Sequence, residues 1–197
     1  MKKIAFVLGN GTSRKCIDLN KLKSFGTIYG CNALYRNFEP EHLVSVDIKM
    51  LKEIHDSGYS KTHNVWSYHH KSIDYMHEIN VIESSSRWSS GPTALWLAAS
   101  HGFKHIYILG FDYVGLHDGT RINNIYADTM NYKRSSQNAT YFRNWLYQTA
   151  SVIKHNKHIQ FYRIIPNDGY KPLELEQLIN YKTVNINEFQ HILNNLS

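Results

Sequence analysis

The chain has 197 residues, of which 42% are hydrophobic and 13% aromatic, and this excludes a disordered chain and suits one globular domain with a sizeable core. Its formal net charge of +6 allows an anionic partner. The basic residues are scattered without a run of five, so the charge supports dedicated nucleic-acid binding only weakly. No apolar run reaches about 18 residues, so no membrane span is expected. The apolar run at residues 4–8 is too short for a signal peptide, so we expect a cytoplasmic protein.

Apolar runs alternate with helix-like stretches, which is typical of an α/β domain with a mainly parallel sheet. Strands are predicted over residues 4–8, 27–31, 43–46, 64–68, 81–82, 105–109 and, as the last strand, 159–164. A short helix or turn is predicted over residues 13–22, and helices over 48–55, 92–101, 140–155 and 187–196, the last with Asn187 as its N-cap. No linker or internal repeat divides the chain, so residues 1–197 are predicted to form a single domain.

The first strand runs into a glycine-rich turn with an arginine behind it. Such a turn presents backbone N–H groups to an anion, commonly a phosphate, and so points to a nucleotide or another phosphorylated ligand. The turn is neither the dinucleotide fingerprint nor a P-loop, and a tight turn without a ligand stays an alternative. The candidate ligand contacts here are Gly9, Asn10, Gly11, Thr12 and Ser13.

Polar residues follow three more predicted strands: Asn32, Asp47 and Asp112. Ligands of open parallel sheets bind beyond the carboxyl ends of the strands, so we expect these residues and the first turn to converge at one edge. The Asn32 amide can bind a base or a ribose, or else stabilise a turn. Asp47 and Asp112 can hold Mg²⁺, or else cap turns.

A hydroxyl-rich stretch over residues 84–92 leads into an apolar helix. Hydroxyls and free N–H groups at a helix start suit a phosphate or a carboxylate, which makes Ser89, Ser90 and Gly91 candidate contacts. Ordinary N-capping by Ser90 is the alternative.

The long polar segment over residues 115–137 is either functional or disordered. His117 is the histidine in it best placed to act as a base, with a plain surface residue as the alternative. The 12 histidines show no HExxH motif and no cluster with cysteine, so no zinc site is predicted. Cys16 and Cys31 are expected to be free thiols, Cys31 in the core.

Four segments in this order resemble the sialyltransferases of glycosyltransferase family 42: the turn GNGTS at residues 9–13, CNALY at 31–35, SSG at 89–91 before an apolar helix, and FKHIYILGFDY at 103–113. The resemblance covers roughly residues 1–165 and leaves 166–197 as a C-terminal extension. It implies a three-layer α/β/α sandwich with a Rossmann-like sheet. It also implies an enzyme that transfers sialic acid from CMP-sialic acid without a metal. It also implies nucleotide contacts by Asn10, Asn32 and Ser90.

The resemblance further implies that Tyr126 lies near the donor phosphate, where its hydroxyl would stabilise the leaving group. The general-base histidine of that family falls near residues 134–136, where this chain has none, and a second donor-site tyrosine falls at Val114. His117 is then the candidate base, provided that its loop folds inward.

Asp47 stands where the sialyltransferases have asparagine. The glycine-rich first turn together with an aspartate at this strand end resembles the pattern of the archaeal 6-hydroxymethylpterin diphosphokinase-like proteins. That second resemblance implies ATP with Mg²⁺ held by Asp47 and Asp112. We expect a glycosyltransferase-like enzyme that uses a nucleotide sugar, of the CMP-sugar type first, with no required cofactor. A diphosphokinase-like enzyme and a non-catalytic nucleotide-binding protein are the alternatives. The acceptor, a glycan or modified DNA, and homo-oligomerisation stay open.

Overall fold

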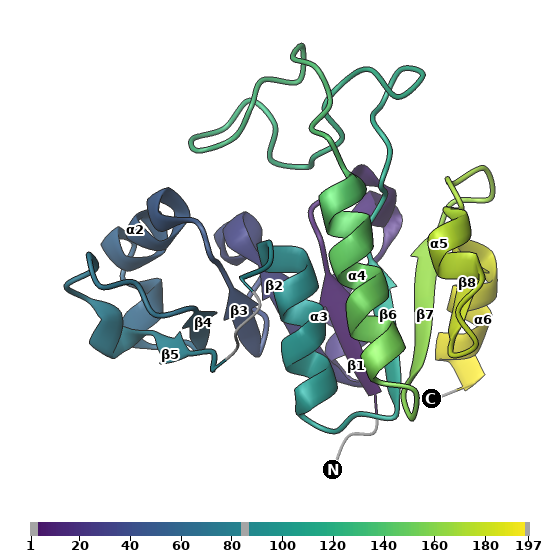
Figure 1. Cartoon of the computed structure of the whole chain (residues 1–197), viewed down its shortest axis with the longest axis horizontal. Coiled ribbons are helices and arrows are strands. Elements are labelled where there is room, and N and C mark those ends of the chain that lie inside the picture. The colour runs from purple at the N-terminus through teal and green to yellow at the C-terminus, as the bar shows by residue number, and fades with distance from the viewer. Residues whose placement is uncertain (1–3, 84–86, 196–197) are drawn as a thin grey trace.

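A computed structural model describes residues 4–83 and 87–195. The described residues contain one eight-stranded sheet, of order β5-β4-β3-β2-β1-β6-β7-β8, in which every neighbouring pair is parallel (Figure 1). The α/β prediction is confirmed, and the sheet is wholly rather than mainly parallel. Its strands are β1 (Ile4–Leu8), β2 (Thr27–Cys31), β3 (His42–Val44), β4 (Val65–Ser67), β5 (Asn80–Val81), β6 (His105–Leu109), β7 (Gln160–Ile165) and β8 (Tyr181–Asn185).

Helices cover both faces of the sheet, because alternate residues of its central strands are apolar on both sides. In β1, Ala5 and Val7 join one buried cluster while Phe6 and Leu8 join the other, as the two-residue repeat of a strand requires. The first cluster includes residues of α3 (Ser90–Ser100), α4 (Arg143–His155) and α5 (Leu173–Glu176). The second includes residues of α1 (Leu19–Lys23), α2 (Ile48–Asp56) and α6 (Ile186–Asn195).

The C-terminal segment completes the sheet instead of following it. The strand predicted over residues 159–164 is present as β7, but the prediction that it is the last strand is wrong. A further strand, β8, pairs with β7 along its whole length. The sequence of β8 gave little signal: it is an edge strand in which only Tyr181 and Val184 are buried. In α6, Phe189 packs on Phe6, with ring centroids 6.3 Å apart.

The N-cap prediction at Asn187 is also wrong. Asn187 is exposed in the first turn of α6, and the side chain of Asn185 accepts the hydrogen bond from the backbone N–H of Glu188. Among the described residues, no helix combines the length and apolarity that a membrane crossing requires.

The order of the strands creates a switch point between β1 and β6. From β1 the chain builds the sheet outward to β5 and then returns through α3 to β6, on the other side of β1. Beyond the carboxyl ends of these two strands the connections diverge and leave a crevice, which is where open α/β sheets bind ligands. The fold therefore places a candidate site at residues 9–11 and 110–115.

Candidate functional site

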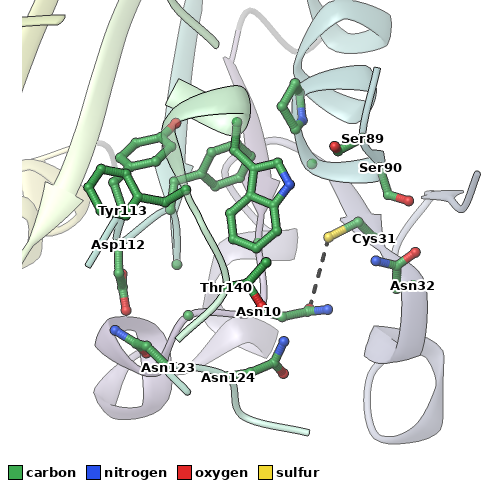
Figure 2. Close-up of a pocket in the computed structure, with 18 of the residues that line it drawn as sticks. Asn10, Cys31, Asn32, Ser89, Ser90, Asp112, Tyr113, Asn123, Asn124 and Thr140 are labelled. Atoms are coloured by element: carbon green, nitrogen blue, oxygen red, sulfur yellow. Dashed lines mark hydrogen bonds between the residues drawn. The ribbon is translucent and has the colours of Figure 1, made fainter. Parts of the chain in front are cut away.

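A cavity of about 350 Å³ lies at this switch point (Figure 2). Its volume is at the lower end of the range of roughly 300–1,000 Å³ for small-molecule sites. Strand ends and the start of α3 form one side, and the segment after β6 forms the other. Among the predicted contacts, the lining includes Gly9, Asn10, Gly11, Asn32, Asp47, Ser89, Ser90, Gly91 and Asp112.

The first turn is not the open anion cradle that its glycines predicted. The backbone N–H groups of Gly9 and Gly11 donate to the carbonyl oxygens of Leu109 and Gly110. The N–H of Thr12 donates to Asn123 Oδ1 at 2.9 Å, and the N–H of Ser13 donates to Asp112 Oδ2 at 3.1 Å. Thr12 and Ser13 do not line the cavity. The turn therefore joins β1 to β6 and the following loop, and only Asn10 keeps an N–H without an acceptor in the described part of the chain.

The start of α3 offers the anion-binding groups instead. The Ser89 N–H donates to Gln148 Oε1, and the Ser90 hydroxyl accepts from the N–H of Val46. Ser90 is therefore not the N-cap; it ties α3 to the end of β3. The N–H groups of Ser90 and Gly91 have no acceptor within residues 4–83 and 87–195. The first N–H groups of a helix carry partial positive charge and suit a phosphate or a carboxylate.

Two asparagines present opposite halves of their amides to the cavity (Figure 2). Asn10 Nδ2 donates to the hydroxyl of Tyr132 at 3.1 Å, so its Oδ1 remains as an acceptor, 3.9 Å from Cys31 Sγ. Asn32 Oδ1 accepts from the Ser45 hydroxyl at 3.1 Å, so its Nδ2 remains as a donor. A φ of 53° at Asn32 places its backbone in the left-handed region that asparagine tolerates. The pair can bind a ligand that carries both an acceptor and a donor.

Cys31 is the buried core residue that the sequence predicted. Its thiol donates to the carbonyl oxygen of Leu8. Burial raises the pKa of Cys31 to about 12, although the positive charge of Arg14 acts in the opposite direction. The side chain therefore stays a neutral thiol at physiological pH and is no nucleophile.

The two strand-end carboxylates are each engaged with a different part of the chain. Asp47 accepts hydrogen bonds from the N–H groups of Lys49 and Met50 and so caps α2, while Asp112 accepts from the N–H and hydroxyl of Ser13. They follow β3 and β6, which β2 and β1 separate, so three strand spacings amount to about 14 Å. Within the described residues no three His, Cys, Asp or Glu side chains gather into a metal-binding group.

The two predicted catalytic residues lie outside the cavity. His117 is exposed, in a turn where its carbonyl oxygen accepts from the N–H of Thr120, so the loop does not fold it inward. Tyr126 is buried beside the cavity: its hydroxyl donates to Asn37 Oδ1 at 2.7 Å and accepts from Arg14. Burial raises the pKa of Tyr126. Neither side chain lines the cavity, so neither is placed to act on a ligand there.

Sequence reasoning missed the residues that close the site. Asn123 fastens the segment after β6 to the first turn, since its Oδ1 accepts from the N–H and hydroxyl of Thr12 and its Nδ2 donates to the carbonyl oxygen of Val114. The Tyr132 hydroxyl accepts from Asn10 Nδ2 and from the N–H of Ala33. These residues stand in an irregular segment without periodicity, so no pattern marked them.

Positive charge lies behind the cavity, because none of the described residues that line it is a lysine, an arginine or a histidine. Arg163 is 1% exposed and donates to the carbonyl oxygens of Phe111, Asp112 and Tyr170. Arg14 is also buried and donates to the carbonyl oxygen of Gly9 at 2.6 Å. Neither arginine forms an ion pair within residues 4–83 and 87–195. Their charges therefore act on the cavity through a medium that screens less than water.

Comparisons of the chain with protein-family models, with curated proteins and with solved structures found no match.

Proposed function

We propose that this protein binds a nucleotide sugar of the CMP-sugar type in the switch-point cavity and transfers its sugar to an acceptor. One observation carries the proposal. The four segments on which the resemblance to family-42 sialyltransferases rests are far apart in the sequence, yet residues from all four line one cavity. The contacts in it are Asn10, Asn32, the N–H groups of Ser90 and Gly91, and the aromatic side chains of Phe142 and Trp145.

The distribution of charge favours a ligand with one phosphate over ATP with Mg²⁺. Polyphosphate sites use lysine or arginine side chains that contact the phosphates, and within residues 4–83 and 87–195 none lines this cavity. The α3 N–H groups and the charges of Arg14 and Arg163 suit one compact anion. Asp47 and Asp112 follow strands three spacings apart and already accept hydrogen bonds from the chain, which disfavours the shared Mg²⁺ ion of the diphosphokinase alternative.

A second candidate function is nucleotide binding without catalysis. It is favoured by the absence of histidine from the described lining and by the outward position of His117. The carboxylates of Asp47 and Asp112 are the ionisable acids of the lining, and both already accept hydrogen bonds from backbone N–H groups. The residues therefore support donor binding more strongly than sugar transfer.

The test of binding is a thermal-shift and calorimetric titration with CMP, UMP, AMP and ATP plus Mg²⁺. A nucleotide at a hundredfold excess over its Kd stabilises the folded state by about 2.7 kcal/mol. CMP is expected to give the largest increase in Tm. No shift with any nucleotide would contradict the proposal.

The substitution Asn32→Asp tests the site itself. Aspartate keeps the acceptor for Ser45 and tolerates the positive φ, but it replaces the Nδ2 donor with a negative oxygen that repels an anion. We expect normal folding and loss of CMP binding. The matched control is Asn187→Asp, the same change on exposed α6, which should leave binding unchanged.

Incubation with a CMP-sugar distinguishes the two candidate functions. Release of CMP that depends on Asn32 supports a transferase. Tight binding without release in the presence of glycan acceptors would select the non-catalytic alternative.

A further inference from the structure

The outer surface of α4 combines exposed aromatic and basic side chains. Arg143, Tyr147 and Lys154 stand at positions i, i+4 and i+11, which places them on one stripe of the helix. All three are exposed; 73% of Tyr147 is accessible to solvent. Tyr141, just before the helix, is 66% exposed. Exposed aromatic side chains that gather with basic ones suit a binding surface better than singly scattered ones do.

This surface has no acidic residue of its own. Between Glu83 and Asp168 the acidic residues are Asp112, Asp118 and Asp128, and all three belong to the segment after β6. The elements α3, β6, α4 and β7 therefore contain no carboxylate side chain. In Figure 1, α3 and α4 lie side by side on the near face of the sheet, and α5, with Glu174 and Glu176, lies on the other side of α4.

Further basic residues extend the surface below α4. Lys104 follows α3, and Lys157 and His158 follow α4; all three are exposed. The two turns lie together, because the N–H of Gln160 donates to the carbonyl oxygen of Lys104 at 2.9 Å. Lys104 and Lys157 therefore add positive charge beyond Lys154, at the C-terminal end of α4.

We propose that this surface, defined by Tyr141, Arg143, Tyr147, Lys154, Lys104 and Lys157, binds single-stranded nucleic acid. Lysine and arginine attract the phosphates, and exposed tyrosine rings offer flat faces on which bases stack. From Arg143 to Lys154 the stripe extends about 16 Å at 1.5 Å per helical residue, which is room for two or three nucleotides. A duplex keeps its bases stacked inside, so it cannot use the tyrosines in this way.

The surface lies outside the cavity, and the inference stands without the proposed donor function. The helix connects the two regions, since Trp145 lines the cavity while Tyr147 does not and is 73% exposed. A strand on this surface would pass near the cavity mouth.

The test is fluorescence anisotropy with a labelled oligothymidine across a series of salt concentrations, without nucleotide sugar. Tyr147→Ala is expected to weaken binding roughly 5- to 150-fold, since one stacked base contributes about 1–3 kcal/mol. The double variant Arg143→Ala/Lys154→Ala is expected to lower the slope of log K against log salt by about 1.4. The matched control Lys49→Ala/Lys61→Ala removes the same charge from α2 and its neighbourhood and should bind as the parent does.

Three results would overturn the inference: no effect of Tyr147→Ala, an equal loss in the Lys49/Lys61 control, or binding of heparin or of the corresponding duplex as tightly as of the single strand. Tyr147 is exposed, so a Tm close to that of the parent shows that its variant is folded. Added CMP is expected to leave oligothymidine binding unchanged, which keeps this result separate from the donor-binding test.

Discussion

The cavity has two walls that are held in place by different kinds of bonds. The strand-end wall consists of residues 9–11, 31–32, 46–47 and 110–112, directly beyond four neighbouring parallel strands, with the start of α3. The loop wall consists of residues 122–124 and 139–140, in a segment that contains no helix or strand. Backbone ladders position the first wall, whereas side chains such as Asn123 and Tyr132 hold the second. Substitutions in the strand-end wall should therefore lower the free energy of unfolding more than substitutions in the loop wall, where the backbone can move locally.

The largest expected effect is at Arg163, beneath the strand-end wall. Arg163→Met removes the donors to three carbonyl oxygens, of which those of Phe111 and Asp112 lie at this wall. Buried acceptors left without a donor cost about 1–3 kcal/mol each, so the free energy of unfolding should fall by about 3 kcal/mol or more. Chemical denaturation measures this. The control Arg134→Met, an exposed position in the segment after β6, should change stability by about 0.5 kcal/mol or less.

The next largest effect is expected from alanine substitutions at two glycines, Gly9 at the strand ends and Gly115 in the segment after β6. A Cβ at Gly9 would collide with the carbonyl oxygen of Gly110, and a Cβ at Gly115 would collide with that of Gly119. Gly9→Ala should lower the free energy of unfolding by about 1–3 kcal/mol, because the β1–β6 ladder prevents relief. Gly115→Ala should cost less, because its turn can move. Equal losses would show that the loop wall is as rigid as the strand ends.

A smaller effect is expected from two tyrosine hydroxyls. Tyr132→Phe and Tyr126→Phe each remove a buried hydrogen-bonding group and should each lower stability by about 1 kcal/mol. Only Tyr132 contacts Asn10, so only its variant should weaken CMP binding in calorimetry. Equal weakening by Tyr126→Phe would mean that the loop wall moves as one unit.

The effect that is smallest at neutral pH concerns two histidines, one in the sheet and one in the loop. Burial, with the charge of His101 as a second cause, lowers the pKa of His42 from 6.5 to about 4. As the pH falls, His42 therefore binds a proton at a higher pH in the unfolded chain than in the folded protein. The stability from neutral His42 is therefore complete above about pH 6.5 and declines down to about pH 4.

In thermal melts, His42→Gln should reduce this decline in Tm while its side-chain oxygen still accepts the hydrogen bond from Trp66 Nε1. The control is the same substitution at exposed His117, which should leave both the pH profile and CMP binding unchanged. A changed profile in the His117→Gln variant would contradict the outward position of that side chain.

Much of the fold could be predicted from the sequence because each central strand is buried on both faces and therefore appears as a continuous apolar run. The runs at residues 4–8, 27–31 and 105–109 are apolar on both faces, and their predicted bounds agree with those of β1, β2 and β6. In the edge strand β8 only Tyr181 and Val184 are buried, one on each face of the sheet, so its pattern was too weak to detect. The positions of Asn32, Asp47 and Asp112 at strand ends followed from the same patterns.

The sequence by itself determined which residues stand at the carboxyl ends of the parallel strands, because an apolar run that stops at a polar residue marks both the strand and its end. Only the tertiary structure decided which groups remain available there. It paired the N–H groups of Thr12 and Ser13 with Asn123 and Asp112, and it turned His117 outward. Such pairings join residues about a hundred positions apart, and the backbone geometry that selects them exists only once the sheet has formed.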